Sequence, residues 1–530
     1  AACAYWHHDR RAPLLILSGV SAGLAILSKS PALALLPAVG MLALAAIWRP
    51  PTTDHRPPTT DHRPRFPSVV RRPSSVVPLP DRESASSSVV RRRSSVVPLL
   101  AWGTVVALTV FALWPALWVG PLRAYAQVRA GVEAEGAGEH VSGNFFLGSE
   151  DDRPGSLFYP VALALRLTPW ALLGLLALPL ALRRAPSTMR RDIASLAGFV
   201  VLFVAAMSLF PNKLNRYLVP IFPTIDILAA IGIVGVIDFR PVQSKIKNLN
   251  SKIVSFVVLL AVANAAWWHP YGIAYFNQVL GGAPAGARTF LIGSGEGMEQ
   301  VAAWLNQQPD ITGVVTVSPM VQTLQPYLRR GARAINPADG ALPKKAGYVV
   351  VYGRQTQRDE LFPPFDQFYG RAVPLYVVSI HGADYARIYQ VPPTVAHARP
   401  ADFGPTIHLR GFTSDLMARR GQRLALELSW EPRATPPADY ALFAHLIGPG
   451  GRRIAQADLP YPTSQWRPGR YVTTQLPLAI PAEAPPGTYR LVIGMYDPAG
   501  GQRLPLAADG PLDPALDGPD ALPLTELELK

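Results

Sequence analysis

The sequence predicts a multi-pass α-helical membrane domain with about seven spans, followed by a small α/β domain and a C-terminal β-sandwich. Three observations lead to this fold class. Of the 530 residues, 49% are hydrophobic and only 16% are charged. The apolar residues form long runs before residue 270, whereas short apolar segments separated by turns follow it. Basic residues gather in alternate connections between the long runs, as they do in membrane proteins.

The membrane domain is predicted to occupy residues 1–270, where seven apolar runs occur. A helix needs about 20 mostly apolar residues to span a bilayer, and several of the runs reach that length. The alternative is a soluble protein with buried core helices, but seven such runs in one half of a chain favour a membrane domain. The runs are 13–28, 31–48, 99–119, 157–182, 193–210, 217–237 and 253–268.

The charge of the connections orients this domain. Basic residues dominate the segments 7–11, 49–98, 183–191 and 240–252, whereas 120–155 holds six acidic and three basic residues. Because lysine and arginine are retained on the cytoplasmic side, we expect the four basic segments inside the cell. The acidic connection, the short connection before the sixth run and everything after the last run then face outward. The sequence therefore predicts a multi-pass protein of the cell membrane with extracytoplasmic C-terminal domains.

Residues 49–98 form a low-complexity insert that we expect to be a disordered cytoplasmic loop. The heptapeptide PTTDHRP occurs twice in succession, and SVVRRPSSVVPL recurs with one change. The insert holds ten Arg against four Asp or Glu, so it supplies +6 of the chain's net charge of +14. The basic charge therefore does not indicate nucleic acid, and we expect no nucleic-acid partner. Contact of the Arg clusters with anionic lipid is the functional alternative to a plain loop.

The first residues of the chain, AACAYWHHDRR, do not resemble a signal peptide. They lack the short apolar core and the small-residue cleavage site of a signal peptide, and the chain starts with Ala1. We therefore expect a fragment whose N-terminal part is missing. The chain has a single cysteine, Cys3, so an intrachain disulfide is ruled out.

Residues 271–398 are predicted to form a small extracytoplasmic α/β domain. Segments 313–318, 347–353 and 372–380 are short, apolar and rich in Val, as expected of strands, and residues 297–308 have helical character. The glycine-rich sequence GSGEG before the helical segment lacks the Lys-Ser/Thr ending and the glycine spacing of nucleotide-binding loops. We therefore expect no nucleotide site there.

Residues 399–530 are predicted to form a β-sandwich, since short strands alternate with turns such as GPGG and DPAGG. The strand segments are IHLRGF, RLALELSW, YALFAHLIG, TTQLPLAI and TYRLVIGMYD. Four aromatic residues in this domain allow two interpretations. They could form a carbohydrate-stacking face, or they could fill the core of the sandwich, which is the commoner use. These residues are Trp430, Tyr440, Trp466 and Tyr489.

Polar residues on the predicted outer face are the candidates for chemistry, because no Ser-His-Asp spacing, HExxH motif or P-loop occurs. The segment FPNKLNRYLVPIFP places two cations and a tyrosine between two apolar runs. Such an arrangement suits a phosphate-bearing amphiphile such as a polyprenyl-phosphate sugar, whose tail lies in the bilayer and whose phosphate lies at the interface. Snorkelling of side chains at a helix end is the alternative interpretation. The candidate ligands are Lys29, His140, Lys213, Arg216 and Tyr217.

Four stretches of the sequence resemble one family of membrane enzymes. SGVSAGLAILSKSPALALLP, WPALWVGP, HVSGNFFLGSEDDRPGSLFYPVALALRLTPWALLGLL and KLNRYLVPIFP are similar to the GT-C membrane glycosyltransferases. The group that they resemble uses lipid carriers and includes protein mannosyltransferases and the lipid A aminoarabinose transferase. The resemblance covers residues 12–48 and 99–308. Its most specific piece is the K-x-x-R-Y-x-x-P-x-x-P pattern of residues 213–223.

The resemblance implies a glycosyltransferase that moves a sugar, with inversion, from a polyprenyl-phosphate carrier to an acceptor glycan, lipid or protein at the outer face. It implies an Asp or Glu in the first outer loop as the base, but no residue here matches that position, so the catalytic residues stay unassigned. By motif match it assigns Lys213 and Arg216 to the donor phosphate, with Tyr217 beside them. His140 matches the family's outer-loop histidine, and Lys29 matches the lysine of its GLA-x-L-[ST]-K stretch.

Two other functions stay open at this point. The chain could be a membrane-anchored extracytoplasmic glycan-binding protein without transfer activity, in which the sandwich binds the glycan. It could instead be a transporter, which would need polar residues at mid-span, and Asp226 is the main one. A divalent metal could be held by acidic residues and His140, although no metal-ligand spacing supports one.

Overall fold

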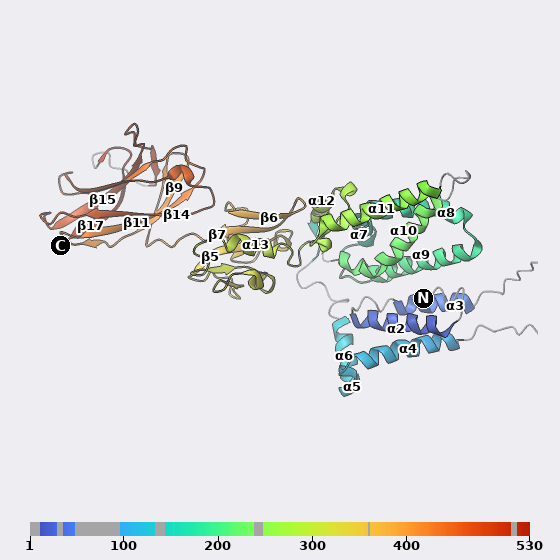
Figure 1. Ribbon diagram of the computed structural model, residues 1–530. Helices are drawn as coiled ribbons and strands as arrows, with labels where there is room; N and C mark the ends of the chain where they lie inside the picture. The colour runs from blue at the N-terminus through green and yellow to red at the C-terminus, as the bar shows by residue number, and fades with distance from the viewer. Residues whose placement is uncertain are drawn as a thin grey trace, which may run out of the picture. The chain divides into compact units, whose positions relative to one another are not determined.

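The computed structural model describes residues 11–28, 35–47, 96–132, 144–151, 153–237, 247–358, 361–509 and 517–530. The chain divides into two compact units, whose elements are labelled in Figure 1. The helical unit comprises Ala1–Val141 and Arg153–Leu259, and the C-terminal unit comprises Ser142–Asp152 and Leu260–Lys530. This division differs from the predicted boundary at residue 270, because a short segment of the acidic connection belongs to the C-terminal unit. The predicted low-complexity insert lies outside the described residues up to residue 95.

The helical unit consists of apolar helices joined by short connections. The elements are α2 (Ala12–Ser28), α3 (Leu35–Ile47), α4 (Val97–Leu113), α5 (Ala116–Val119), α6 (Pro121–Val132), α7 (Phe158–Arg166), α8 (Pro169–Arg184), α9 (Ser187–Ser208), the 3-10 helix η3 (Asn215–Ile221), α10 (Phe222–Ile237) and α11 (Lys247–Trp268), whose last turns belong to the C-terminal unit. Within the described ranges, two helices are long and apolar enough to cross a membrane, Ser187–Ser208 and Asn215–Val236. A third results if α7 and α8, bent by 113°, count as one span.

The remaining apolar helices are shorter than a bilayer span. Ala12–Ser28, Val97–Leu113 and Val254–Trp268 fall in this class. The helical unit therefore contains helices suited to a membrane, but by length they are fewer than the seven predicted runs.

The bend between α7 and α8 follows from the local sequence. Leu167 and Thr168 both take extended backbone conformations, and Pro169 begins α8. Proline disfavours the helical conformation of the residue before it and lacks a backbone N–H. The Thr168 hydroxyl then caps α8 by accepting a hydrogen bond from the Ala171 N–H at 3.2 Å. The chain therefore ends one helix and starts another instead of continuing through.

Glycine residues let two pairs of helices pack closely. A Cβ added to Gly19 of α2 would lie 2.7 Å from Val105 of α4. A Cβ added to Gly232 of α10 would collide with the carbonyl oxygen of Gly174 on α8. Close packing of small residues is what holds helices together in lipid, where the hydrophobic effect between helices is absent. These two pairs are therefore built as membrane helix pairs are built.

A mixed five-stranded sheet forms the first part of the C-terminal unit, in the order β4-β3-β5-β7-β6. Strand β3 pairs in parallel with β4 and β5, and β7 pairs antiparallel with β5 and β6. The three predicted Val-rich strands are found as β3, β5 and β6, and the predicted helical segment as α13. Strands β4 and β7 were missed because they lack a run of Val. The elements are α12 (Gly282–Thr289), α13 (Met298–Leu305), β3 (Val315–Val317), α14 (Val321–Leu324), β4 (Arg333–Ile335), β5 (Ala346–Tyr352), α15 (Gly353–Thr356), β6 (Tyr376–Ile380) and β7 (Ala383–Gln390).

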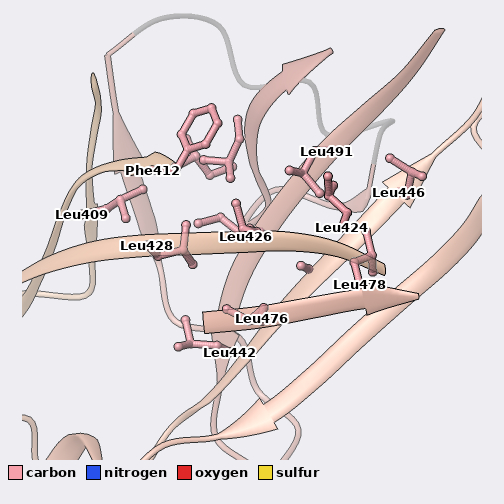
Figure 2. Close-up of a cluster of buried hydrophobic side chains, with 14 of the residues drawn as sticks. Leu409, Phe412, Leu424, Leu426, Leu428, Leu442, Leu446, Leu476, Leu478 and Leu491 are labelled. Atoms are coloured by element: carbon pink, nitrogen blue, oxygen red, sulfur yellow. The ribbon is translucent and has the colours of Figure 1, made fainter. Parts of the chain in front are cut away.

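Two further five-stranded sheets share one hydrophobic core, in the orders β10-β17-β15-β12-β13 and β14-β11-β9-β8-β16. The strands are β8 (His397–Phe403), β9 (Ile407–Thr413), β10 (Met417–Ala418), β11 (Arg423–Pro432), β12 (Ala441–Ile447), β13 (Arg453–Pro460), β14 (Val472–Ala479), β15 (Gly487–Tyr496), β16 (Leu506–Ala508) and β17 (Leu522–Leu529). Figure 2 shows side chains from both sheets in this core. The five predicted strand segments are found as β9, β11, β12, β14 and β15, so the predicted β-sandwich is confirmed.

The four aromatic residues considered for sugar stacking belong to the core of the sandwich. Trp430 is completely buried, and Trp466 and Tyr489 are buried in the same cluster, against which Tyr440 packs. The Trp430 Nε1–H donates to Thr474 Oγ1 at 2.8 Å, which satisfies the indole inside the protein. The prediction that these residues form a carbohydrate-stacking face is therefore wrong. The alternative prediction, that they fill the core of the sandwich, is confirmed.

Candidate functional site

The predicted ligand segment lies where three helices of the helical unit meet. Helix α9 ends at Ser208, three residues before Pro211. A turn follows it, and the extended Leu214 leads into η3. η3 contacts α7, α9 and α10. Leu218 and Ile221 of η3 are completely buried and anchor the segment between these helices. The polar residues of the segment are therefore held at the end of a helix bundle.

Lys213 is buried, and its charge is directed to the backbone. Its side chain is only 5% exposed, and its Nζ donates a hydrogen bond to the carbonyl oxygen of Pro154 at 2.6 Å. A buried ammonium needs such a partner because it has lost its hydration. The bond joins residues 59 positions apart and holds the chain before α7 against the segment after α9. Lys213 thus fixes the shape of the site.

Arg216 and Tyr217 lie on the more accessible side of the same segment. Arg216, on η3, is exposed, and Tyr217 is half-buried. Tyr159 of α7 is completely buried close to Tyr217. Consecutive residues at the accessible end of an apolar bundle therefore carry a guanidinium and a phenol, two groups that can bind phosphate through charge-assisted hydrogen bonds.

Arg153 is a further exposed cation that the motif comparison missed. It directly precedes Pro154, whose carbonyl oxygen binds Lys213. The exposed side chains of Arg153 and Arg216 therefore flank one hydrogen bond, although 63 positions separate them in the sequence. In the sequence Arg153 is a single arginine after three acidic residues. Such a pattern is typical of a solvated loop and does not indicate a binding site.

Two of the five predicted ligands, Lys29 and His140, lie outside the described residues. The acidic residues 133–139 that were considered for a metal lie outside them as well. Within the described ranges, no cluster of three or more His, Cys, Asp or Glu residues is placed to hold a metal ion. The site that the structure describes therefore consists of cations and a tyrosine.

A hairpin of the acidic connection packs into the C-terminal unit. It consists of β1 (Phe145–Phe146) and β2 (Ser149–Glu150). The Leu147 N–H donates to the Thr289 carbonyl oxygen at 3.0 Å, and the rings of Phe146 and Phe290 lie 5.8 Å apart. The connection before α7 and the chain after α11 thus belong to one folded body.

Comparison with known proteins adds little to this picture. No protein-family model matches the chain, and no curated protein matches it. Among solved structures, one match is the CARDB domain of a Pyrococcus furiosus protein, solved in complex with di-metal ions. It is 8% identical and covers 26% of this chain and 95% of its own, with a TM-score of 0.14. At that score the likeness carries no argument, and the sandwich rests on its own strand pairing and shared core.

Proposed function

We propose that the chain is part of a membrane glycosyltransferase that moves a sugar from a polyprenyl-phosphate carrier to an acceptor at the outer face. The observation that supports this most is the exposed Arg216 beside Tyr217, on a segment held at the junction of α7, α9 and α10 by the Lys213–Pro154 bond. The sequence resemblance to the GT-C enzymes rests on the same segment.

The geometry suits a lipid phosphate better than a soluble one. A polyprenyl chain places its tail among apolar helices and its phosphate at the interface. Arg216 offers two parallel N–H groups to a phosphate, and the Tyr217 hydroxyl can donate a further hydrogen bond. Arg153, next in sequence to the Pro154 that binds Lys213, is a second exposed arginine of the described residues around this bond. Lys213 has a positioning role in this scheme, because its ammonium is buried against Pro154.

The transfer step needs one group that is not assigned in this chain. A base takes the proton of the acceptor hydroxyl, the hydroxyl oxygen attacks the anomeric carbon, and the bond from that carbon to the phosphate oxygen breaks. The lipid phosphate gains negative charge as this bond breaks. Cations beside the phosphate therefore lower the energy of the transition state for transfer. Arg216 and Arg153 are suited to this stabilisation, whereas the resemblance places the base in an outer loop that no residue of this chain matches.

A membrane domain of seven spans is part of the proposal, and two contacts support it. If the Lys213–Pro154 bond lies at one face of the membrane, the start of α7 and the end of α9 are on the same side. If α9 crosses, the bent pair α7 and α8 must therefore cross too, and cannot be a re-entrant turn.

The hairpin contact extends the same reasoning to α10 and α11. Leu147 and Thr289 are hydrogen-bonded, so the segments before α7 and after α11 lie on one side. If α10 crosses, α11 must cross as well, although its apolar part is short. Four crossings after residue 153, added to the three earlier apolar runs of the sequence at 13–28, 31–48 and 99–119, make seven. The basic connections then face the cytoplasm, and Arg216 faces outward.

The test of the proposed function removes the exposed guanidinium. Binding of a synthetic polyprenyl phosphate to the full chain in nanodiscs should weaken about tenfold or more in Arg216→Ala, because a hydrogen bond to a charged group contributes about 1.5–3 kcal/mol. Binding by Arg216→Lys should be weaker than in the natural chain and stronger than in Arg216→Ala, since lysine keeps the charge but lacks the two parallel N–H groups of arginine. The matched control is Arg184→Ala, which removes an exposed arginine at the C-terminal end of α8 and should bind normally. Unchanged binding by Arg216→Ala would overturn the assignment.

A further inference from the structure

The chain turns back alongside α11 after that helix ends. Two 3-10 turns follow it, η4 (Gly272–Ala274) and η5 (Gln278–Leu280). The Gln278 Nε2 donates to Asn264 Oδ1 of α11 at 2.6 Å. Asn264 lies four residues before the last residue of the helix, about 6 Å along its axis. This bond therefore ties η5 to the last two turns of α11.

The turn around η5 has its polar residue inside and its apolar residues outside. Asn277 is completely buried, and its Oδ1 accepts a hydrogen bond from the Val279 N–H at 3.0 Å. Val279 is 76% exposed and Leu280 is 43% exposed. In water this arrangement would leave apolar surface unburied, at a cost of about 25 cal/mol per Å². In contact with lipid the same arrangement is favourable.

The turn is fixed rather than loosely attached. The Gly282 N–H donates to the Asn277 carbonyl oxygen at 2.9 Å, and Gly281 adopts φ +99°, a conformation that glycine permits. The exposed apolar side chains are thus held outward by the fold.

Aromatic residues surround the end of α11. Trp268 is buried against Tyr275, with ring centroids 5.2 Å apart, and against His381, at 4.0 Å. Trp267, its neighbour, is 70% exposed. Tryptophan and tyrosine gather where a membrane protein meets the headgroup layer. The exposed Trp267 therefore suits a bilayer boundary at the end of α11, the end of the helix to which Gln278 ties η5.

We propose that residues 271–281 form a lipid-contact turn, which inserts Val279 and Leu280 into the outer leaflet beside α11. The partner is the bilayer itself, because the turn is bonded to the last turns of α11, an apolar helix whose Leu259 and Val262 are exposed as well. Such a turn sets the height of the C-terminal unit above the membrane. The inference rests on the crossing of α11 and is independent of sugar transfer.

The test places a spin label on the turn of the full chain in liposomes. Cys3→Ser removes the chain's only cysteine, and Val279→Cys introduces the labelling site. Accessibility of the label to oxygen, which concentrates in lipid, is compared with accessibility to a water-soluble nickel chelate. Leu259→Cys on α11 is the lipid-facing reference, and Met417→Cys, an equally apolar residue that is 62% exposed on the sandwich, is the aqueous reference.

The Val279 label should resemble the Leu259 label, with high oxygen and low nickel accessibility. Gln278→Ala, which removes the bond to Asn264, should raise the nickel accessibility of the Val279 label. A Val279 label as open to nickel as the Met417 label would overturn the proposal. So would an immobile label shielded from both reagents, which would mean that a protein covers the turn, and dipolar coupling between labels would identify that protein as a second copy. Leu280→Cys repeats the measurement should Val279→Cys fail to fold.

Discussion

At the scale of single residues, two cations in one segment have different roles. Lys213 and Arg216 are three positions apart and both match the same motif. The structure buries Lys213 on the Pro154 carbonyl and leaves Arg216 exposed. The sequence correctly predicted that a cationic segment lies between two helices. It could not predict which of the two cations is buried and which is accessible. That distinction depends on a residue 59 positions away.

His445 in the sandwich should make the stability of that domain sensitive to pH. It is buried, its Nδ1 lies 2.7 Å from Asp517 Oδ2, and Arg453 Nη1 lies 3.2 Å from its Nε2. Burial lowers the pKa of His445 below its usual value of 6.5, although Asp517 acts in the opposite direction. The unfolded chain therefore takes up a proton first as the pH falls. Stability is full above about pH 6.5 and decreases below it, by at most about 1.4 kcal/mol per pH unit.

Hydrogen exchange of β12 in the full chain, corrected for the intrinsic rate, measures this effect. Protection of β12 should fall between pH 7.5 and pH 5.5 in the natural chain, as the unfolded His445 protonates near its usual pKa. In His445→Gln, protection of β12 should be lower than in the natural chain at both pH 7.5 and pH 5.5. It should change less between these two pH values. An equal change in the two proteins would show that other groups cause the pH dependence.

At the scale of elements, local pattern predicted what each segment becomes, and packing decided how the segments join. The Val-rich and alternating segments became β3, β5 and β11 as expected, because alternation of side chains is a local property of strands. The α7–α8 bend was not predicted, although Thr168 and Pro169 are its visible cause. The pairing of α8 with α10 was not visible in the sequence either, since it depends on which glycine faces which carbonyl.

Gly232→Ala should destabilise the helical unit, although alanine is the better helix former. The added methyl group would meet the Gly174 carbonyl oxygen and force α8 and α10 apart, and overpacking of this kind costs about 1–3 kcal/mol. The matched control is Gly198→Ala on α9, where a Cβ meets nothing within 4 Å. Unfolding by SDS titration in mixed micelles compares the two variants. Equal stability of Gly232→Ala and Gly198→Ala would contradict close packing of α8 and α10.

At the scale of the whole molecule, two hydrogen bonds constrain the path of the chain through a membrane. Lys213 to Pro154 and Leu147 to Thr289 each join segments that several helices separate. Helix length alone supports two spans, or three with the bent pair. Under the proposal that α9 and α10 both cross, the two contacts imply an even number of crossings between their partners, which makes four.

Cysteine labelling tests this path directly. In the Cys3→Ser background, an impermeant maleimide added to intact cells should label Ser149→Cys on β2 and should not label Ser187→Cys at the start of α9. Both positions are exposed, so accessibility from outside is what differs. Ser187→Cys should react once the membrane is permeabilised. Labelling of Ser187→Cys in intact cells would mean that α7 and α8 form a re-entrant turn, and the proposed seven spans would be wrong.

The sequence by itself determined the order of the parts: apolar helices first, then a mixed sheet, then a sandwich. It could do so because hydrophobic periodicity is local and is set by the residues of each segment. Only the tertiary structure decided that Lys213 is buried, that the 145–150 hairpin joins the C-terminal unit, and that Trp430 fills a core. Each of these depends on a partner far away in the chain, and the choice of that partner depends on how whole faces pack together. Local pattern carries no information about that choice.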